Sequence, residues 1–264
     1  MTRLLVFDSG IGGLSVAIEI RRAIPAAEII YVADDAGFPY GDREEGELSE
    51  HVVTLVGELI EHFKPDAVVI ACNTASTLVL PVLRERFTIP FVGTVPAIKP
   101  AAERTRSEMI SVLATPGTME RDYTRALIES YAGHCAVRLV GSSNLAPIAE
   151  AYMRGEPVDD ATIFAEIAPA FVKGKEGRRT DIIVLACTHY PFLRAHFDRL
   201  APWPVEWIDP ASAIARRVVA VAGDSTRGTE GGGQAFLTSG QPWPEALSDM
   251  LRRLGLSTPP PELG

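Results

Sequence analysis

The chain has 264 residues, of which 47% are hydrophobic and 22% charged, a globular composition whose length favours two modest domains over one. The formal net charge of −9 argues against a nucleic-acid-binding protein, because no basic stripe is present to neutralise phosphates. No segment approaches the roughly 18 apolar residues of a membrane-spanning helix. A strand pattern begins already at Arg3, which leaves no room for a signal peptide. We therefore expect a cytoplasmic protein without membrane contact, in which cysteines are free thiols.

Expected strands and helices alternate along the chain, which is typical of an α/β fold with doubly wound, mainly parallel sheets. The first half is expected to hold strands near residues 3–7, 28–33, 67–71 and 91–93, and helices over 14–23, 48–63 and 74–87. The second half is expected to hold strands near 109–114, 136–140, 181–186 and 205–208, and helices over 119–131, 145–153, 160–173 and from 192 onward. After these we expect a helix over 211–222, a mobile glycine-rich loop over 223–233, an edge strand over 234–238, a helix over 246–254 and a frayed end.

The pattern of the first half begins again after residues 94–97, which we interpret as a crossing between two domains. Each half opens with a strand, a polar loop and a helix, and each contains a later strand that ends in Ala-Cys. This weak internal repeat predicts two pseudo-symmetric domains that face each other.

The two Ala-Cys strands carry the most distinctive motifs of the chain. Residues 67–74 read AVVIACNT, and residues 181–189 read DIIVLACTH. Continuous apolar runs rich in Val and Ile are typical of parallel strands buried on both faces. Cys72 and Cys187 would then lie at the carboxyl ends of their strands, where open α/β sheets bind ligands.

Several roles are open to these two cysteines. A single buried cysteine is more often a packing residue than a reactive one. A metal site would need three or four ligands, and the chain has neither C-x-x-C nor H-x-x-x-H. A Cys–His nucleophile would use one cysteine rather than two equivalent ones. A paired acid and base would use both, because one thiolate could take a proton from a carbon while the opposite thiol returns one, which inverts the stereocentre.

A glycine-rich loop, DSGIGG at residues 8–13, follows the first expected strand and opens a helix. Its spacing fails the dinucleotide fingerprint, because the third glycine position falls on Ser15. We still expect its backbone N–H groups to contact a small anionic ligand. No lysine occupies a polar strand end suited to a Schiff base, so we expect no cofactor and no metal. The polar residues that could hold a carboxylate are Ser9, Asn73, Thr74, Thr118 and Thr188.

In these motifs, and over nearly its whole length, the chain resembles the glutamate racemases of the aspartate/glutamate racemase superfamily. The motifs that carry the resemblance are FDSGIGG at 7–13, AD at 33–34 with PYG at 39–41, ACNTA at 71–75, PA at 96–97, Thr115 with Thr118, and ACTHYP at 186–191.

The resemblance implies cofactor-independent interconversion of L- and D-glutamate, which supplies D-glutamate for peptidoglycan. It implies that Cys72 takes the α-proton of D-glutamate with help from Asp8, and that Cys187 takes that of L-glutamate with help from His189. The substrate-binding residues that it implies are Asp8, Ser9, Tyr40, Gly41, Asn73, Thr74, Thr118, Thr188 and His189. It also suggests a homodimer.

The family fold has two α/β domains with the active site in the cleft between them. Applied to this chain, it predicts a first domain of residues 1–97 plus 208–264 and a second of residues 98–207. The chain departs from the family at residues 141–144, where members often carry Cys-Pro, so no role is assigned to Glu150. It also begins at its first strand, without the N-terminal extension of members that a cell-wall precursor activates, so we expect no such activation. The alternatives are a racemase of aspartate or a related amino acid, and a non-catalytic module that binds a small anion.

Overall fold

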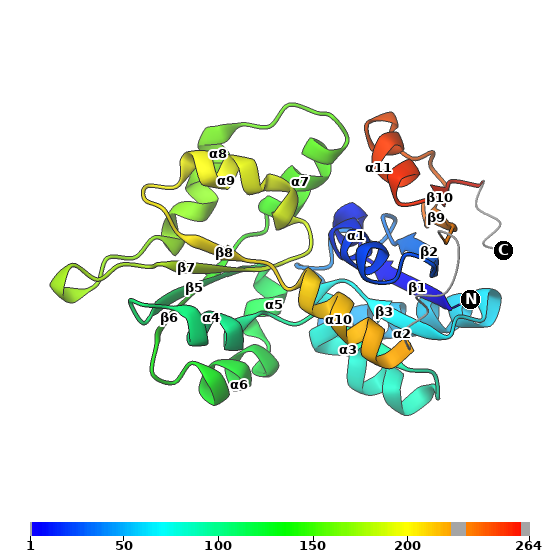
Figure 1. The fold of residues 1–264 in the computed structure, drawn as a ribbon, viewed down its shortest axis with the longest axis horizontal. Coiled ribbons are helices and arrows are strands. Elements are labelled where there is room, and N and C mark those ends of the chain that lie inside the picture. Colours follow the sequence, from blue (N-terminus) through cyan, green and yellow to red (C-terminus); the bar gives the residue numbers. More distant parts are fainter. Residues whose placement is uncertain (1, 223–230, 260–264) are drawn as a thin grey trace.

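The computed structural model describes residues 2–222 and 231–259, which form two parallel sheets with helices on both faces (Figure 1). The first sheet has the strand order β10-β9-β2-β1-β3-β4, and the second has the order β6-β5-β7-β8. All paired strands within these two sheets run parallel. The predicted fold class is therefore confirmed. The chain passes from the first sheet to the second between β4 and β5, and it returns between β8 and β9.

The strands have the following bounds: β1 Arg3–Asp8, β2 Glu28–Ala33, β3 Ala67–Ile70, β4 Phe91–Gly93, β5 Met109–Ala114, β6 Ala136–Gly141, β7 Ile182–Ala186, β8 Glu206–Ile208, β9 Gly233–Leu237 and β10 Leu256–Ser257. The α-helices are α1 Leu14–Ala23, α2 Glu45–Phe63, α3 Asn73–Arg86, α4 Ile98–Arg104, α5 Pro116–Glu120, α6 Asp122–Tyr131, α7 Leu145–Met153, α8 Asp160–Ile167, α9 Arg194–Leu200, α10 Ala211–Ala222 and α11 Ser248–Arg253. Short 3₁₀ helices cover Ile11–Gly13, Ala168–Ala170, Lys175–Gly177, Tyr190–Leu193 and Glu245–Leu247.

Both faces of the first sheet are buried, as its continuous apolar strands require. Leu4 and Val6 of β1 pack with α1, α10 and α11 on one face. Leu5 and Phe7 pack with α2 and α3 on the other face. Successive side chains of a strand point to opposite faces, so one short apolar run supplies two cores.

The second sheet is covered in the same way. Leu113 of β5 and Leu185 of β7 pack with α7, α8 and α9 on one face. Val112 and Val184 pack with α4 on the other face. The Ala-Cys strands β3 and β7 are thus interior strands, and the residues that follow them emerge at the carboxyl edges of their sheets.

The longest helix, α2, shows how the local sequence sets an element. Its N-cap carboxylate, Glu44, accepts a hydrogen bond from the backbone N–H of Glu47 at 2.8 Å, which satisfies one free donor of the first turn. Its buried side chains, among them Leu48, Val52 and Leu59, recur at three- and four-residue spacing. The helix ends at a residue in the left-handed conformation, Lys64, with φ of 49°.

Two predictions about elements were wrong. The strand near residues 234–238 is not an edge strand, because the two-residue strand β10 pairs with β9 through Leu256 and Gly233. The helix expected over 160–173 ends at Ile167, since Pro169 lacks the N–H that a continuing helix would use. Most of the loop expected over 223–233, and the frayed end, lie outside the described residues. Among residues 2–222 and 231–259, no helix is both long and apolar enough to cross a bilayer.

Candidate active site

The carboxyl edges of the two sheets face one another across a cavity of about 20 Å³. It is lined from the first sheet's side by residues that include Ser9, Tyr40 and Cys72, and from the second sheet's side by Cys187 and His189. A cavity of this size holds about one water molecule. The site is therefore closed in this structure, and a larger ligand can enter only if the two sides move apart.

Most of the side chains predicted from the sequence converge here. The predicted residues that line the cavity are Ser9, Tyr40, Gly41, Cys72, Asn73, Thr74, Cys187, Thr188 and His189. Two predicted residues, Asp8 and Thr118, lie directly behind this lining: Thr188 Oγ1 donates to Asp8 Oδ2 at 3.4 Å, and Thr118 Oγ1 lies 3.3 Å from Thr74 Oγ1. The lining residues that the prediction missed are Phe38, Pro39, Asp42, Thr115, Pro116, Ser143 and Ala146.

The Cys72 side of the cavity is strongly buried and acidic. Cys72 lies at the start of α3, and its Sγ is 3.6 Å from Ser9 Oγ. Asp8 is fully buried and accepts a hydrogen bond from the backbone N–H of Gly13 at 2.5 Å. Burial raises the pKa of Cys72 well above its ordinary value, and the Asp8 carboxylate raises it further. Burial also raises the pKa of Asp8, an effect that the charge of His189 opposes.

The Cys187 side carries an imidazole backed by a second carboxylate. Cys187 Sγ lies 3.7 Å from Nδ1 of His189, and Nε2 of His189 lies 2.9 Å from Oε1 of Glu150 on α7. Although burial favours the neutral ring, the hydrogen bonds to Cys187 and Glu150 raise the pKa of His189 well above its ordinary value. Burial likewise opposes the charged form of Glu150, but His189 lowers the pKa of this carboxylate overall. A protonated His189 places a positive charge beside the sulfur of Cys187.

Glu150 is the main residue that the sequence left without a role. The same oxygen that meets His189 also accepts the backbone N–H of Ile11 at 2.7 Å. Arg154 Nη2 lies 3.3 Å from the other carboxylate oxygen. Glu150 therefore links the loop after β1 to His189, whose ring lies beside Cys187. No local motif around α7 signals this contact.

The glycine-rich loop packs closely against residues from the second half of the chain. A Cβ atom at Gly12 would lie 2.4 Å from Nδ1 of His189, and one at Gly10 would lie 2.3 Å from Oε1 of Glu150. The N–H groups of Ile11 and Gly13 are used by Glu150 and Asp8. The glycines thus allow close packing against the second half of the chain, and any contact of this loop with an anion would have to use its other N–H groups.

Unpartnered polar atoms gather around the cavity. The buried side-chain N and O atoms without a partner in the described part of the chain are Asp8 Oδ1, Asn73 Oδ1, Asn73 Nδ2 and Arg121 Nε. Because buried polar groups are nearly always hydrogen-bonded, the three atoms of Asp8 and Asn73 indicate a site built for a polar ligand.

A cluster of three hydroxyl groups adds to this polarity. Thr74 Oγ1 lies 2.9 Å from Thr115 Oγ1, which lies 3.1 Å from Thr118 Oγ1. Asn73 is also the first residue of α3 and lines the cavity, and the N-terminus of a helix favours an anionic group nearby. The arrangement suits a ligand that carries carboxylates.

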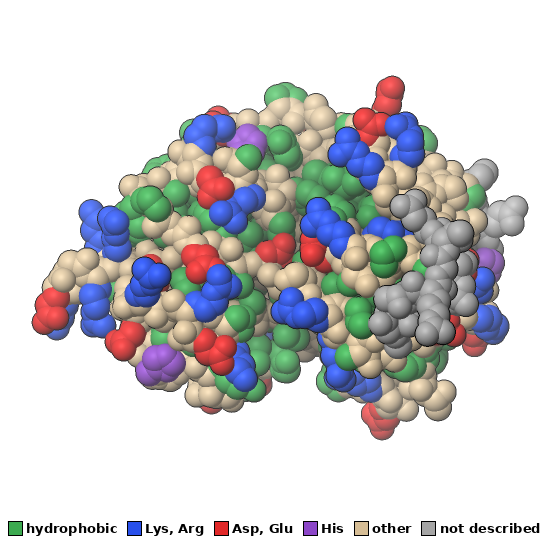
Figure 2. Space-filling view, in the orientation of Figure 1, with side chains coloured by type: hydrophobic (Ala, Val, Ile, Leu, Met, Phe, Trp, Pro, Cys, Tyr) green, Lys and Arg blue, Asp and Glu red, His purple; other side chains and the backbone are tan. Residues whose placement is uncertain are grey.

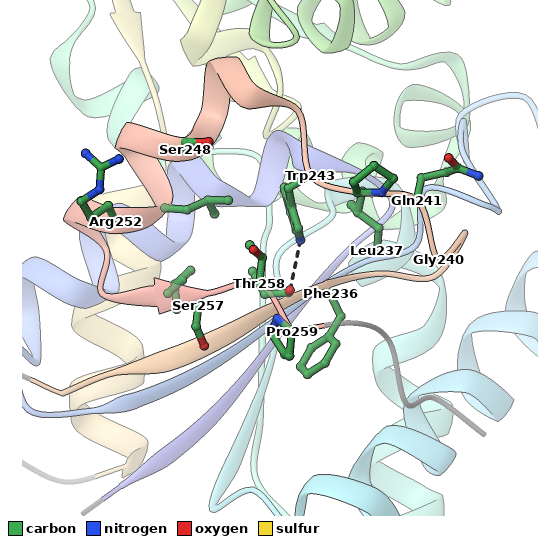
Figure 3. Close-up of a pocket in the computed structure, with 14 residues that line it drawn as sticks. Phe236, Leu237, Gly240, Gln241, Trp243, Ser248, Arg252, Ser257, Thr258 and Pro259 are labelled. Atoms are coloured by element: carbon green, nitrogen blue, oxygen red, sulfur yellow. Dashed lines mark hydrogen bonds between the residues drawn. The ribbon is translucent and has the colours of Figure 1, made fainter.

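A much larger cavity, of about 640 Å³, lies between β9, β10 and α11 (Figure 3). Its described lining residues include no Cys, His, Asp or Glu. Its one charged lining residue, Arg252, pairs with Asp249, and Trp243 Nε1 donates to the carbonyl oxygen of Ala235 at 3.0 Å. Size alone therefore does not identify the reactive site, and the acid–base groups lie in the small cavity. Within residues 2–222 and 231–259, no three His, Cys, Asp or Glu side chains are grouped so that they could hold a metal ion.

Each of the two α/β units brings one thiol to a shared polar cavity. This is the arrangement that the resemblance to the two-cysteine racemases implies, and comparison with known proteins agrees with that class. Residues 12–218 match the family model described as Asp/Glu/Hydantoin racemase, and the chain belongs to this family. The resemblance predicted from the motifs is therefore confirmed.

Individual relatives are similar over most of their length. The chain is 62% identical to a glutamate racemase of Brucella anthropi over 219 residues, which cover 83% of this chain and 78% of that protein. It is 56% identical to a glutamate racemase of Brucella canis over 257 residues, or 96% of this chain and 92% of that protein. The crystal structure of Escherichia coli glutamate racemase in complex with L-glutamate and the activator UDP-MurNAc-Ala aligns with a TM-score of 0.85 at 39% identity, covering 97% of this chain and 96% of that one.

Proposed function

We propose that this protein interconverts L- and D-glutamate by proton transfer to and from two cysteines, Cys72 and Cys187. The observation that carries the proposal is that both thiols line one closed polar cavity from different sheets. Relatives that are 56–62% identical are named glutamate racemases.

Two opposed thiols suffice for the chemistry without a cofactor. With D-glutamate bound, the thiolate of Cys72 removes the α-proton from one face, and the thiol of Cys187 delivers its proton to the other face. With L-glutamate the roles are exchanged. The pair gains and loses one proton in each turnover, so the enzyme returns to a state with one thiol and one thiolate.

The residues beside the two thiols carry opposite charges: His189 beside Cys187 is positive, and Asp8 beside Cys72 is negative. A protonated His189, held by Glu150, stabilises negative charge on Cys187. On the other side, Asp8 disfavours the thiolate of Cys72 until a positive charge arrives. The ammonium group of an amino acid supplies that charge and pairs with Asp8, so that ionisation of Cys72 is coupled to substrate binding.

The remaining predicted residues would hold the substrate. The free amide of Asn73 and the N–H groups at the start of α3 suit one carboxylate, and the hydroxyl cluster of Thr74 and Thr118 suits a second one. Ser9, Tyr40, Gly41, Thr188 and His189 complete the lining. Preorganised donors of this kind stabilise the negative charge that develops when the α-proton leaves.

We also propose the division into residues 1–97 plus 208–264 and residues 98–207, which the membership of the two sheets supports. The resemblance supports a cytoplasmic homodimer that supplies D-glutamate for peptidoglycan. Basic and acidic side chains are interspersed over the face shown in Figure 2, which fits a small-molecule substrate better than a nucleic acid.

Circular dichroism with L-glutamate and L-aspartate as separate substrates tests the activity and distinguishes the aspartate alternative. Reaction in deuterium oxide should place deuterium at the α-carbon of the product at each turnover. Cys72→Ala and Cys187→Ala should abolish racemisation, whereas Cys135→Ala, which changes the third cysteine outside the cavity, should retain it. Full retention of the α-proton in deuterium oxide would favour a non-catalytic binding module. The same conclusion would follow if the wild type did not racemise glutamate and the two cysteine variants bound it as tightly as the wild type does.

A further inference from the structure

The turn that follows β9 reaches the loop that carries Tyr40, although the two segments are about 200 residues apart in the chain. β9 pairs in parallel with β2, and the last pair of the ladder joins Leu237 to Ala33. The next residue, Thr238, continues this register by donating its N–H to the carbonyl oxygen of Ala33 at 3.0 Å. The carboxyl end of β9 is thereby placed beside Asp34, the first residue after β2.

The hydroxyl group of Thr238 both donates and accepts a hydrogen bond with this loop. Thr238 Oγ1 donates to Asp34 Oδ1 at 2.7 Å and accepts the backbone N–H of Ala36 at 3.3 Å. The next residue, Ser239, holds Asp35 at both oxygens: its N–H donates at 2.9 Å and its hydroxyl at 2.6 Å.

Asp34 connects Thr238 to a residue that lines the cavity. It is buried, and its second oxygen, Oδ2, accepts the hydroxyl of Tyr40 at 2.5 Å and lies 2.6 Å from Nε2 of His51. Its carbonyl oxygen accepts the N–H of Gly37 at 3.0 Å. One carboxylate oxygen is thus fixed by Thr238, and the other fixes Tyr40, which lines the cavity together with Gly41 and Cys72.

We propose that Thr238 and Ser239 are positioning residues for the substrate, acting through Asp34 and Asp35 on the loop that carries Tyr40 and Gly41. Neither residue lines the cavity, so neither touches the reacting atoms. Both oxygens of Asp34 are used, so loss of the Thr238 donor frees the carboxylate to rotate and displaces the Tyr40 hydroxyl. The inference rests on the proposed function, because its readout is the affinity for glutamate.

The test compares Thr238→Val with Thr238→Ser. The valine variant keeps the shape but removes the donor to Asp34 and the acceptor for Ala36, whereas the serine variant keeps the hydroxyl group. For Thr238→Val we expect KM for both glutamate enantiomers to rise about tenfold, as for loss of one hydrogen bond to a charged group, with kcat within about threefold. For Thr238→Ser we expect values near those of the wild type.

The matched control is on β10 and contacts the other end of β9. Ser257 Oγ donates to the carbonyl oxygen of Gly233 at 3.1 Å, so Ser257→Ala also removes a hydroxyl contact with β9 but leaves residues 34–41 untouched. We expect its KM and kcat to stay unchanged. A role in stability alone would lower the melting temperature and the active fraction of Thr238→Val without raising KM.

A double-mutant cycle with Tyr40→Phe tests the route of the effect. If Thr238 acts through Asp34 on the Tyr40 hydroxyl, the double variant should have a KM close to that of Tyr40→Phe alone. A KM for Thr238→Val within twofold of the wild type, or fully additive effects in the cycle, would overturn the inference. Should Thr238→Val not fold, Ser239→Ala, at an exposed position, replaces it with the same expected direction. Failure of the wild type to racemise glutamate would instead reject the proposed function.

Discussion

Nε2 of His189 lies 2.9 Å from Oε1 of Glu150, and the same oxygen accepts the N–H of Ile11 from the other half of the chain. The carboxylate therefore has two tasks, because it keeps the imidazole protonated beside Cys187 and fixes the loop that follows β1. We expect Glu150→Gln still to fix the loop, since an amide oxygen accepts the N–H of Ile11. The variant should no longer keep His189 protonated, because the amide carries no charge.

For Glu150→Gln we expect kcat to fall about 10- to 100-fold in both directions, as for loss of one charged hydrogen bond worth about 1.5–3 kcal/mol. Steady-state circular dichroism measures this effect. The exposed Glu156, three residues beyond the end of the same helix, provides the control, and Glu156→Gln should leave kcat unchanged. A wild-type kcat for Glu150→Gln would show that His189 does not depend on this charge.

Asp8 should show a conflict between stability and activity. Burial raises its pKa, so the ionised carboxylate is less stable in the folded protein than in the unfolded chain. Asp8 therefore lowers the free energy of unfolding at any pH above the ordinary Asp pKa of about 3.9. Asp8→Asn removes that penalty and keeps an acceptor for the N–H of Gly13. At pH 7 we expect the free energy of unfolding to stay equal or rise by about 1 kcal/mol, while racemisation falls at least about 100-fold.

Urea denaturation at several pH values checks the sign of this effect. The advantage of Asp8→Asn should shrink as the pH falls and vanish below the ordinary Asp pKa of about 3.9, because the wild-type carboxyl group then becomes neutral in both states. Asp122→Asn, at an exposed position on α6, serves as the control. A loss of more than 1 kcal/mol for Asp8→Asn at pH 7 would mean that the carboxylate stabilises the fold.

The alkaline stability of the protein should depend on Cys72. Burial and Asp8 raise the pKa of this thiol, so the folded state keeps its proton while the unfolded chain releases it above a pH of about 8.5. The free energy of unfolding of the wild type should therefore fall as the pH rises from 8 to 10, by up to about 1.4 kcal/mol per pH unit from this thiol. Cys72→Ala lacks this contribution, so its stability relative to the wild type should improve with rising pH.

Thermal or urea unfolding of both proteins across this pH range measures the difference. Other groups that titrate there, including Cys135, whose pKa burial also raises, contribute equally to both proteins and cancel. Parallel pH profiles for the wild type and Cys72→Ala would contradict the buried, protonated state of the Cys72 thiol.

The sequence pattern of a single strand was enough to predict the site residues that directly follow that strand. The apolar runs before Cys72 and Cys187 identify two buried parallel strands, and parallel strands present their carboxyl ends at one edge of a sheet. This rule alone brings the two thiols and the residues that follow them, Asn73 and Thr188, to the edges that face one another.

Contacts between distant segments were not predictable in this way. The period of α7 indicates which residues face the core, but it does not show that Glu150 meets His189 and the N–H of Ile11. The glycines of the loop after β1 match an anion cradle locally, yet their missing side chains make room for His189 and Glu150. The strand β10 has two residues, too few for any periodicity, so the position of β9 in the sheet was also mistaken.

Opening of the closed cavity should depend on an ion pair that joins the two halves of the chain outside the cavity lining. Arg121, which precedes α6 and is only 7% exposed, pairs with Glu45 at the start of α2. Two further links lie nearby: Ser143 Oγ donates to Asp42 Oδ1 at 3.0 Å, and the N–H of Gly117 donates to the carbonyl oxygen of Gly41 at 3.1 Å. These contacts join the two sides of a cavity that must open to admit a substrate and must close around it.

We expect Glu45→Gln to weaken the closed form, because the buried guanidinium of Arg121 loses its carboxylate while the shape of the partner is kept. KM should rise about threefold for both enantiomers with kcat within about twofold, a modest effect because Glu45 is largely exposed to solvent. Glu47→Gln is the matched control, since Glu47 pairs with Arg43 on the same side of the cavity. Because salt screens exposed charges, the difference in KM between Glu45→Gln and the wild type should narrow at about 1 M salt. An unchanged KM at low salt would show that the Arg121–Glu45 pair does not hold the cavity closed.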